Sequence, residues 1–331
     1  MKAAVVPKIG SKWEVREVPT PEPSANQVLI KIRASGLCYT DVHMTEGKLS
    51  VPIEFPRTIG HEPVGEVVAL GEGVTTRKVG DRVGVPYIQA SCGRCEWCLR
   101  WKPMFCAQRI GTGIGIQGSH AEYMVAYADA TMLIPDGLAD EQAAPVFCAG
   151  YTVWSGIRWA NPKPHERIAV VGIGGLGHLA LQYSKAAGFE TIAVTHSKDK
   201  VELAHKLGAD VVVSDGQGLR EAGGADIILA TSNSYKAASD TLRGLKPDGR
   251  LMFIGASDEP FTIPSPGELW MNRLQIIGSN QNGREYLYEA LDYVAKGKVK
   301  VMAETFHLDD VVDAYEKVAN GDVRFRAVIK D

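Results

Sequence analysis

The sequence predicts an α/β protein of two domains, one a doubly wound parallel sheet of six strands and the other an irregular, mostly antiparallel β domain. Short β-like runs broken by glycine and proline fill roughly the first 150 of the 331 residues, whereas strand-like and helix-like segments alternate from about residue 167. Such alternation is typical of a parallel sheet covered by helices on both faces. The length fits two domains of roughly 150 residues each.

The composition is that of an ordinary globular chain and excludes several functional classes. Apolar residues make up 45% and charged residues 23%, and 36 Lys and Arg against 39 Asp and Glu leave a net charge of -3. This charge provides no basic field for nucleic acid or an anionic membrane, and no apolar run approaches the roughly 18 residues of a membrane span. Residues 1–7 lack an apolar leader, so we expect a cytoplasmic protein without nucleic-acid or membrane partners.

The first half is expected to contain short antiparallel strands. Apolar, β-branched runs bounded by glycine or proline occur at 28–32, 65–70 and 81–85. After Gly283 only one helical pattern, at 285–295, and a short β tail remain, which is too little for a third domain. The sequence therefore predicts one domain from residues 1–149 and 283–331, and a second from residues 150–282.

The second half alternates strands and helices. Amphipathic helical patterns cover 176–187 and 198–207. The six expected parallel strands are 168–171, 191–195, 211–213, 226–230, 250–254 and 274–278.

A glycine-rich turn follows the first of these strands. Residues 172–177 fit the pattern G-x-G-x-x-G, which alone also describes many plain strand–helix turns. Here the pattern lies between a strand and a helix, the context that a dinucleotide-binding Rossmann domain requires. In that role Gly172 permits the tight turn, Gly174 lets the pyrophosphate approach the backbone, and Gly177 allows close helix packing. The candidate dinucleotide-binding residues at this turn are Gly172, Gly174, Gly175, Leu176 and Gly177.

The end of the next strand favours NADP over NAD. An acidic residue at this point would bind the ribose 2′-hydroxyl of NAD, but Thr195 occupies the position. Hydroxyls and cations suit a 2′-phosphate. The alternatives are a solvated loop, or NAD bound through Asp199. The candidate 2′-phosphate residues are Thr195, His196, Ser197 and Lys200.

Four of the six cysteines form a compact cluster in the sequence, at Cys92, Cys95, Cys98 and Cys106. A long chain with few cysteines and no export signal is expected to keep its thiols reduced. Four thiolates satisfy tetrahedral zinc and leave no position for substrate, which predicts a structural zinc site. A redox Cys-x-x-Cys pair would leave two cysteines unused, and an iron–sulfur cluster has the same ligand requirement.

Cys38, His61 and Cys148 form a second candidate metal site. Together they would make a Cys₂His set, which leaves a fourth position for substrate, water or Glu62. Their spacing does not show that they meet in the fold, and buried structural cysteines are an equally good interpretation.

Several motifs resemble those of the zinc-dependent medium-chain alcohol dehydrogenases. Residues 38–43 (CYTDVH) and 60–65 (GHEPVG) are similar to that family's signature, and the four-cysteine loop, residues 148–152 (CAGYT) and the glycine-rich turn follow in the family's order. The likeness extends over the whole chain. It is greatest to the microbial and cinnamyl-alcohol-dehydrogenase-like branch, and it implies a GroES-like catalytic domain beside the Rossmann domain.

The resemblance implies roles for the residues around the second site. Cys38, His61 and Cys148 would hold a catalytic zinc ion, with Glu62 as an alternating ligand, and Asp41 would fix the tautomer of His61. The alcohol would react as a zinc-bound alkoxide that gives its hydride to the nicotinamide. Its proton would pass from Thr40 through the nicotinamide ribose to His43.

The resemblance also implies contacts with cofactor and substrate. Thr152 and Leu176 would lie near the nicotinamide, and Arg326 would bind the pyrophosphate. Tyr39 departs from the family, because some members carry a cation there. Leu49 and Ile88 would line the substrate pocket, and their moderate size suggests primary alcohols and aldehydes, including bulky or aromatic ones.

The function expected from the resemblance is that of a zinc-dependent alcohol dehydrogenase or aldehyde reductase with two zinc ions per chain, working as a homodimer or homotetramer. NADP is the favoured cofactor and NAD the alternative. Two other interpretations stay open: an NAD-dependent polyol or sugar dehydrogenase of the same family, and a non-catalytic, redox-sensing zinc-thiolate protein.

Overall fold

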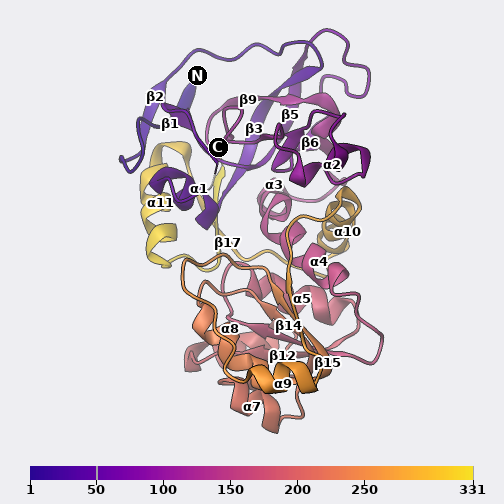
Figure 1. Ribbon diagram of the computed structural model, residues 1–331. Coiled ribbons are helices and arrows are strands. Elements are labelled where there is room, and N and C mark those ends of the chain that lie inside the picture. Colours follow the sequence, from indigo (N-terminus) through magenta and orange to yellow (C-terminus); the bar gives the residue numbers. More distant parts are fainter. Residues whose placement is uncertain (50, 331) are drawn as a thin grey trace. The chain divides into compact units, whose positions relative to one another are not determined.

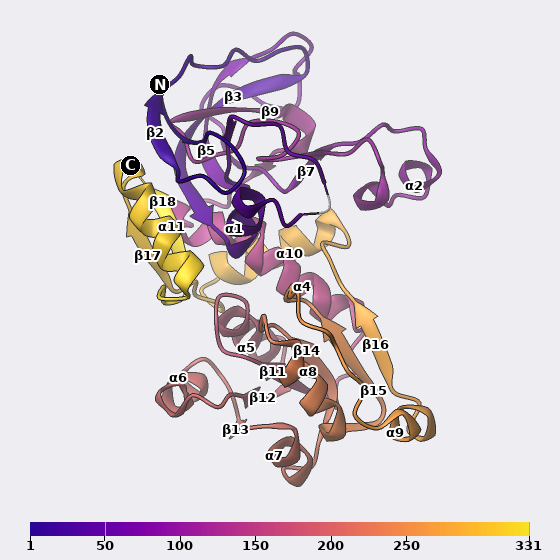
Figure 2. The same ribbon diagram turned by 60° about the vertical axis from the view of Figure 1, so that its left-hand side comes forward.

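The computed structural model describes residues 1–49 and 51–330. The chain divides into two compact units: unit 1 comprises Met1–Cys148 and Val301–Asp331, and unit 2 comprises Ala149–Lys300 (Figures 1 and 2). Within the described part of the chain, no helix is both long and apolar enough to cross a membrane.

Unit 2 contains the parallel six-stranded sheet that the sequence predicts. Its strands run in the order β13-β12-β11-β14-β15-β16, which is the doubly wound order 3-2-1-4-5-6 of a Rossmann domain. Every neighbouring pair is parallel. The strands are β11 (Arg167–Val171), β12 (Glu190–Val194), β13 (Val211–Val213), β14 (Ala225–Ala230), β15 (Leu245–Phe253) and β16 (Gln275–Gly278).

Both faces of this sheet are covered. Successive strand residues point to opposite faces, and Ile168, Ala169 and Val170 are all fully buried. One face packs on Leu219 and Ala238 from two of the helices. The helices of unit 2 are α4 (Ala149–Trp159), α5 (Gly177–Ala186), α6 (Val201–Lys206), α7 (Gly216–Glu221), α8 (Tyr235–Thr241), α9 (Pro266–Met271) and α10 (Arg284–Ala295).

The second domain boundary differs from the expected one. The sequence predicts it at residues 282/283, but α10 belongs to unit 2 and the chain enters unit 1 only at Val301. The reason is the packing of α10 on α4: Trp154 Nε1 donates a hydrogen bond to Glu289, and the Trp154 ring lies 4.8 Å from that of Tyr293. A helical pattern alone does not reveal which sheet or helix it will cover.

Unit 1 is built on a seven-stranded sheet in the order β10-β6-β5-β3-β18-β17, with β9 also paired to β3. Its strands are β3 (Gln27–Leu37), β5 (Glu62–Leu70), β6 (Arg82–Gly84), β9 (Tyr123–Tyr127), β10 (Met132–Leu133), β17 (Ala303–Phe306) and β18 (Arg326–Lys330). The pairs are antiparallel except for β17 with β18. The C-terminal tail thus returns to unit 1, where β18 pairs with β3.

The remaining elements of unit 1 surround this sheet. Leu37 from β3 and Val311 from α11 belong to one buried apolar cluster, and the short α2 projects from the sheet on a long loop (Figure 2). The sequence did not indicate α11. These elements are β1 (Lys2–Val6), β2 (Glu14–Glu17), α1 (Tyr39–Glu46), β4 (Arg57–Thr58), β7 (Ile88–Ala90), α2 (Glu96–Leu99), β8 (Ile110–Gly111), α3 (Asp140–Ala143) and α11 (Val311–Asn320).

Candidate metal centres and cofactor site

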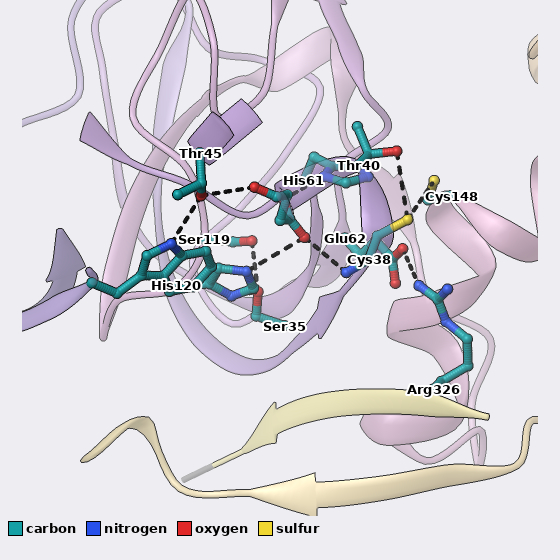
Figure 3. Close-up of polar contacts among 12 residues, drawn as sticks. Ser35, Cys38, Thr40, Thr45, His61, Glu62, Ser119, His120, Cys148 and Arg326 are labelled. Atoms are coloured by element: carbon teal, nitrogen blue, oxygen red, sulfur yellow. Dashed lines mark hydrogen bonds and ion pairs between the residues drawn. The ribbon is translucent and has the colours of Figure 1, made fainter. Parts of the chain in front are cut away.

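Four residues from distant parts of unit 1 converge at one point (Figure 3). One side-chain ligand atom from each of Cys38, His61, Glu62 and Cys148 lies within 4.8 Å of the other three. Sγ of Cys38 and Sγ of Cys148 are 3.9 Å apart. Two thiolates bound to tetrahedral zinc at about 2.3 Å lie about 3.8 Å from each other, so the pair has the spacing that zinc requires.

Local structure fixes the position of Cys38. It follows β3 and is the N-cap of α1, where its own amide donates a hydrogen bond to Asp41 Oδ2 at 2.8 Å. The pKa of the Cys38 thiol lies well below its usual value because Cys148 donates a hydrogen bond to its sulfur, and because Arg326 is positively charged nearby. A thiolate at this position is the form that binds metal.

Asp41 also orients His61. The second oxygen of Asp41, Oδ1, lies 2.9 Å from His61 Nδ1, and both side chains are buried. Since Nδ1 is occupied, His61 presents Nε2 as its free ligand atom, and Nε2 is buried without a hydrogen-bond partner among the described residues. A buried imidazole nitrogen without a partner beside two sulfurs suits a metal ion.

Glu62 is shared between the metal set and a buried arginine. Arg326, on β18, donates a hydrogen bond to Glu62 Oε1, whereas Glu62 Oε2 has no partner within the described chain. Burial raises the pKa of Glu62 to about 8, and the positive charge of Arg326 opposes that shift. The guanidinium of Arg326 thus has Glu62 as a partner, and its expected contact with the cofactor pyrophosphate stays a prediction.

The other expected catalytic and pocket residues lie on or near these elements. Thr40 Oγ1 lies within hydrogen-bond distance of Cys38 Sγ, at 3.6 Å. His43, one turn further along α1, is half-buried and packs edge-to-face against Tyr39. Leu49 packs against the apolar cluster of unit 1, and Ile88 is half-buried on β7.

The four clustered cysteines form the second group. Their sulfurs all lie within 4.8 Å of one another, with Cys92 Sγ 3.9 Å and Cys95 Sγ 3.6 Å from Cys98 Sγ. The backbone amides of Arg94 and Cys95 donate hydrogen bonds to Cys92 and lower the pKa of its thiol to about 6. All four ligands come from the chain, so this group can bind a tetrahedral metal but offers no open position.

The glycine turn of unit 2 needs glycine at two of its positions for different reasons from the third. Gly172 has φ +84°, and a Cβ on Gly177 would lie 1.9 Å from the Gly172 carbonyl oxygen. A Cβ on Gly174, in contrast, would meet no atom within 4 Å. Gly172 and Gly177 are therefore required by the fold, whereas the small size of Gly174 leaves open space at the backbone.

The expected 2′-phosphate residues lie just after β12. Ser197 N donates a hydrogen bond to Thr195 Oγ1 at 3.3 Å, and Lys200 Nζ donates one to the Ile173 carbonyl at 3.0 Å. Lys200 thus joins this loop to the glycine turn. His196 is exposed, and Gly175, Leu176 and Thr152 are half-buried.

Two features of unit 1 were not predicted from the sequence. One is the Arg326–Glu62 pair, whose members are 264 residues apart. The other is a buried polar group made of Ser35, Ser119 and His120. Isolated serine and histidine residues carry no motif, so no signal in the sequence pointed to this group.

Comparison with known families also finds two different domains in the chain. Residues 24–136 match the alcohol dehydrogenase GroES-like domain and residues 175–296 the zinc-binding dehydrogenase domain. The prediction of a GroES-like domain beside a Rossmann domain is thereby confirmed.

Individual relatives match over the whole chain. An alcohol dehydrogenase of Geobacillus stearothermophilus is 39% identical over 336 residues, covering 100% of this chain and 99% of its own. One from Moraxella is 38% identical, with 99% of each chain covered. Among solved structures, the alcohol dehydrogenase of Aeropyrum pernix has a TM-score of 0.90 at 27% identity, with 100% of both chains covered. The chain therefore belongs to the zinc-dependent medium-chain alcohol dehydrogenase family.

Proposed function

We propose that the protein interconverts primary alcohols, including bulky or aromatic ones, with their aldehydes, and that it uses NADP in preference to NAD. The observation that carries this proposal is the convergence of Cys38, His61, Glu62 and Cys148 on one point in unit 1. Three of these ligands form the Cys₂His set of a catalytic zinc site, which keeps one position open.

Cys38, His61 and Cys148 would hold the zinc ion. When bound, zinc would supply Lewis acidity to the oxygen of the substrate, and the nicotinamide would supply a hydride acceptor as NADP⁺ or a hydride donor as NADPH. Glu62, held on one side by Arg326, is the carboxylate that can occupy the fourth position between turnovers. Asp41 keeps the proton of His61 on Nδ1, so that Nε2 stays available as a ligand.

Thr40 and His43 would move the proton of the alcohol. The Thr40 hydroxyl lies beside Cys38, so it can accept a hydrogen bond from the hydroxyl of an alcohol bound there and release its own proton as it takes up that of the alcohol. His43 follows on the same face of α1, since residues three apart in a helix are neighbours. Its half-buried ring can pass the proton on to solvent.

The loop after β12 supports NADP. Thr195 and Ser197 provide hydroxyls and Lys200 a cation, and no carboxylate stands at the end of the strand to repel a 2′-phosphate. Solved relatives bind either cofactor: a zinc-binding dehydrogenase of Sinorhizobium meliloti was solved with NADP, and an acetophenone reductase of Geotrichum candidum with NAD.

The pocket residues support a primary, hydrophobic substrate. Leu49 and Ile88 are aliphatic and only partly buried, so they present apolar surface without a polar group for a sugar or polyol. One solved relative is a cinnamyl alcohol dehydrogenase of Sorghum bicolor, with a TM-score of 0.88 at 28% identity.

The four-cysteine group would bind a second, structural zinc ion.

Initial rates and metal content test this function. We expect close to two zinc ions per chain, and faster reduction of benzaldehyde than of acetone, with NADPH better than NADH. A preference for sorbitol and NAD would contradict this proposal and favour the function of a polyol dehydrogenase. Zinc at the four-cysteine group without any turnover of alcohol or aldehyde would favour a redox-sensing zinc-thiolate protein.

A further inference from the structure

A second buried histidine faces the carboxylate that orients His61. His120 is completely buried, and its Nε2 lies 3.7 Å from Asp41 Oδ2, without a hydrogen-bond partner among the described residues. The other oxygen of Asp41 contacts His61 Nδ1 at 2.9 Å. Asp41 therefore lies between two imidazole rings, of which only one belongs to the candidate metal set.

The environment of His120 selects one tautomer. Its Nδ1 lies 2.9 Å from Ser35 Oγ, and Ser35 Oγ lies 2.7 Å from Ser119 Oγ (Figure 3). Ser119 can donate to Ser35, and Ser35 can then donate to Nδ1, which leaves the ring proton on Nε2. The opposite tautomer would point the lone pair of Nε2 at the Asp41 carboxylate, which is electrostatically unfavourable in a buried site.

Backbone packing holds the ring in place. His120 N donates a hydrogen bond to the Ile59 carbonyl at 3.0 Å. Gly60 has φ +106°, and a Cβ there would lie 2.8 Å from His120 N and 2.9 Å from its Cγ. The backbone that leads into His61 therefore packs directly on His120.

We propose that His120 is a positioning residue for the metal centre: its Nε2–H faces Asp41 Oδ2 and fixes the carboxylate that orients His61. The proposal rests on the proposed zinc-binding role of His61. Partners of metal ligands typically change metal affinity about 10- to 100-fold when they are removed. His120 acts one contact further away, so we expect a loss near the lower end, about 10-fold.

Two amide substitutions test the two ring nitrogens of His120 separately. In H120Q the terminal amide reaches the place of Nε2 and keeps a donor toward Asp41. In H120N the shorter amide replaces Nδ1 and leaves Asp41 without that donor. The matched control is H165N, which makes the same change at an exposed histidine of unit 2. Zinc affinity of each full-length protein is measured by competition with a chromogenic chelator, to which the two sites release zinc in separate phases. The phase that is missing in the H61A protein belongs to the Cys38 site.

We expect H120N to bind zinc at this site about 10-fold more weakly, with a changed visible spectrum after cobalt substitution, while H120Q and H165N match the unmodified protein. Equal affinities in H120N and the unmodified protein overturn the positioning role. If H120N does not fold, the S35A protein is measured instead, because it keeps the ring of His120 but removes the donor to Nδ1. An unchanged zinc affinity in S35A overturns the positioning role in the same way. Absence of zinc at this site in the unmodified protein refutes the proposed function instead.

Discussion

Arg326 and Glu62 form a buried ion pair between β18 and β5, in which the guanidinium donates to Glu62 Oε1. The other carboxylate oxygen lies against Gly36, where a Cβ would come within 1.9 Å of it. The glycine thus leaves the space that Glu62 Oε2 occupies. One oxygen of Glu62 is neutralised by a cation, and the carboxylate still lies within reach of Cys38 and His61.

Removal of Arg326 should therefore destabilise the protein strongly. R326M leaves the buried Glu62 carboxylate without its partner, which typically costs about 3–5 kcal/mol. Because the pKa of Glu62 is already raised to about 8 and rises further without Arg326, the carboxyl binds a proton at pH 6. The loss in free energy of unfolding should thus be larger at pH 9 than at pH 6, as measured by urea unfolding.

R273M is the matched control for this change. Arg273 pairs with Asp248 on the surface of unit 2, with both side chains exposed, and such pairs contribute about 1 kcal/mol or less. Equal losses in R273M and R326M at pH 9 would show that the Glu62 pair is not a desolvated one.

The two cysteine groups should respond differently to serine substitution. C38S removes a ligand from the open site, so we expect turnover to disappear and one zinc ion to be lost while the far-ultraviolet circular dichroism stays unchanged. C95S opens the closed site, so the thermal midpoint should fall while turnover of the remaining folded enzyme at 25 °C stays within about threefold. Zinc content, melting curves and rates measured on both proteins decide the matter. A C95S protein as stable as the original would rule out a structural metal there.

The sequence alone predicts the central strands of the parallel sheet well because they are buried on both faces. Such strands appear as continuous apolar runs, and the run at residues 168–171 lies within β11 (Arg167–Val171). The two sets of metal ligands could be proposed because cysteine and histidine are typical zinc ligands. Their spacing left open whether Cys38 and Cys148 meet, which the structure answers with 3.9 Å between the sulfurs.

The contacts that the sequence did not reveal depend on tertiary packing. Nothing in the local sequence indicates that Arg326 pairs with Glu62, because Glu62 is reached only when β18 pairs with β3 and β3 pairs with β5. The same holds for α10, whose helical pattern does not show that it packs on α4. His120 is one of eight histidines, and only its place beside Asp41 sets it apart.

A carboxylate at the end of β12 should reverse the cofactor preference. T195D places a negative charge where we propose that the 2′-phosphate binds, so KM for NADPH should rise at least about 10-fold through like-charge repulsion, while KM for NADH falls. Steady-state kinetics with both cofactors and one aldehyde measure this change. T195N, which has nearly the same size without the charge, is the control and should have a much smaller effect. Equal effects of the two variants would place the adenosine ribose elsewhere.

Alanine substitutions in the glycine turn should separate folding from cofactor binding. A Cβ on Gly177 would overlap the Gly172 carbonyl oxygen, at 1.9 Å, so G177A should destabilise unit 2 by about 2 kcal/mol or more. A Cβ on Gly174 meets no atom within 4 Å, so G174A should melt like the unmodified protein. Its methyl group would instead project from the backbone that the pyrophosphate approaches, so the Kd for NADPH, measured by fluorescence titration, should rise about 10-fold. G267A, where a Cβ is equally unhindered, controls for the substitution itself. Unchanged NADPH affinity in G174A would mean that the pyrophosphate does not bind at this turn.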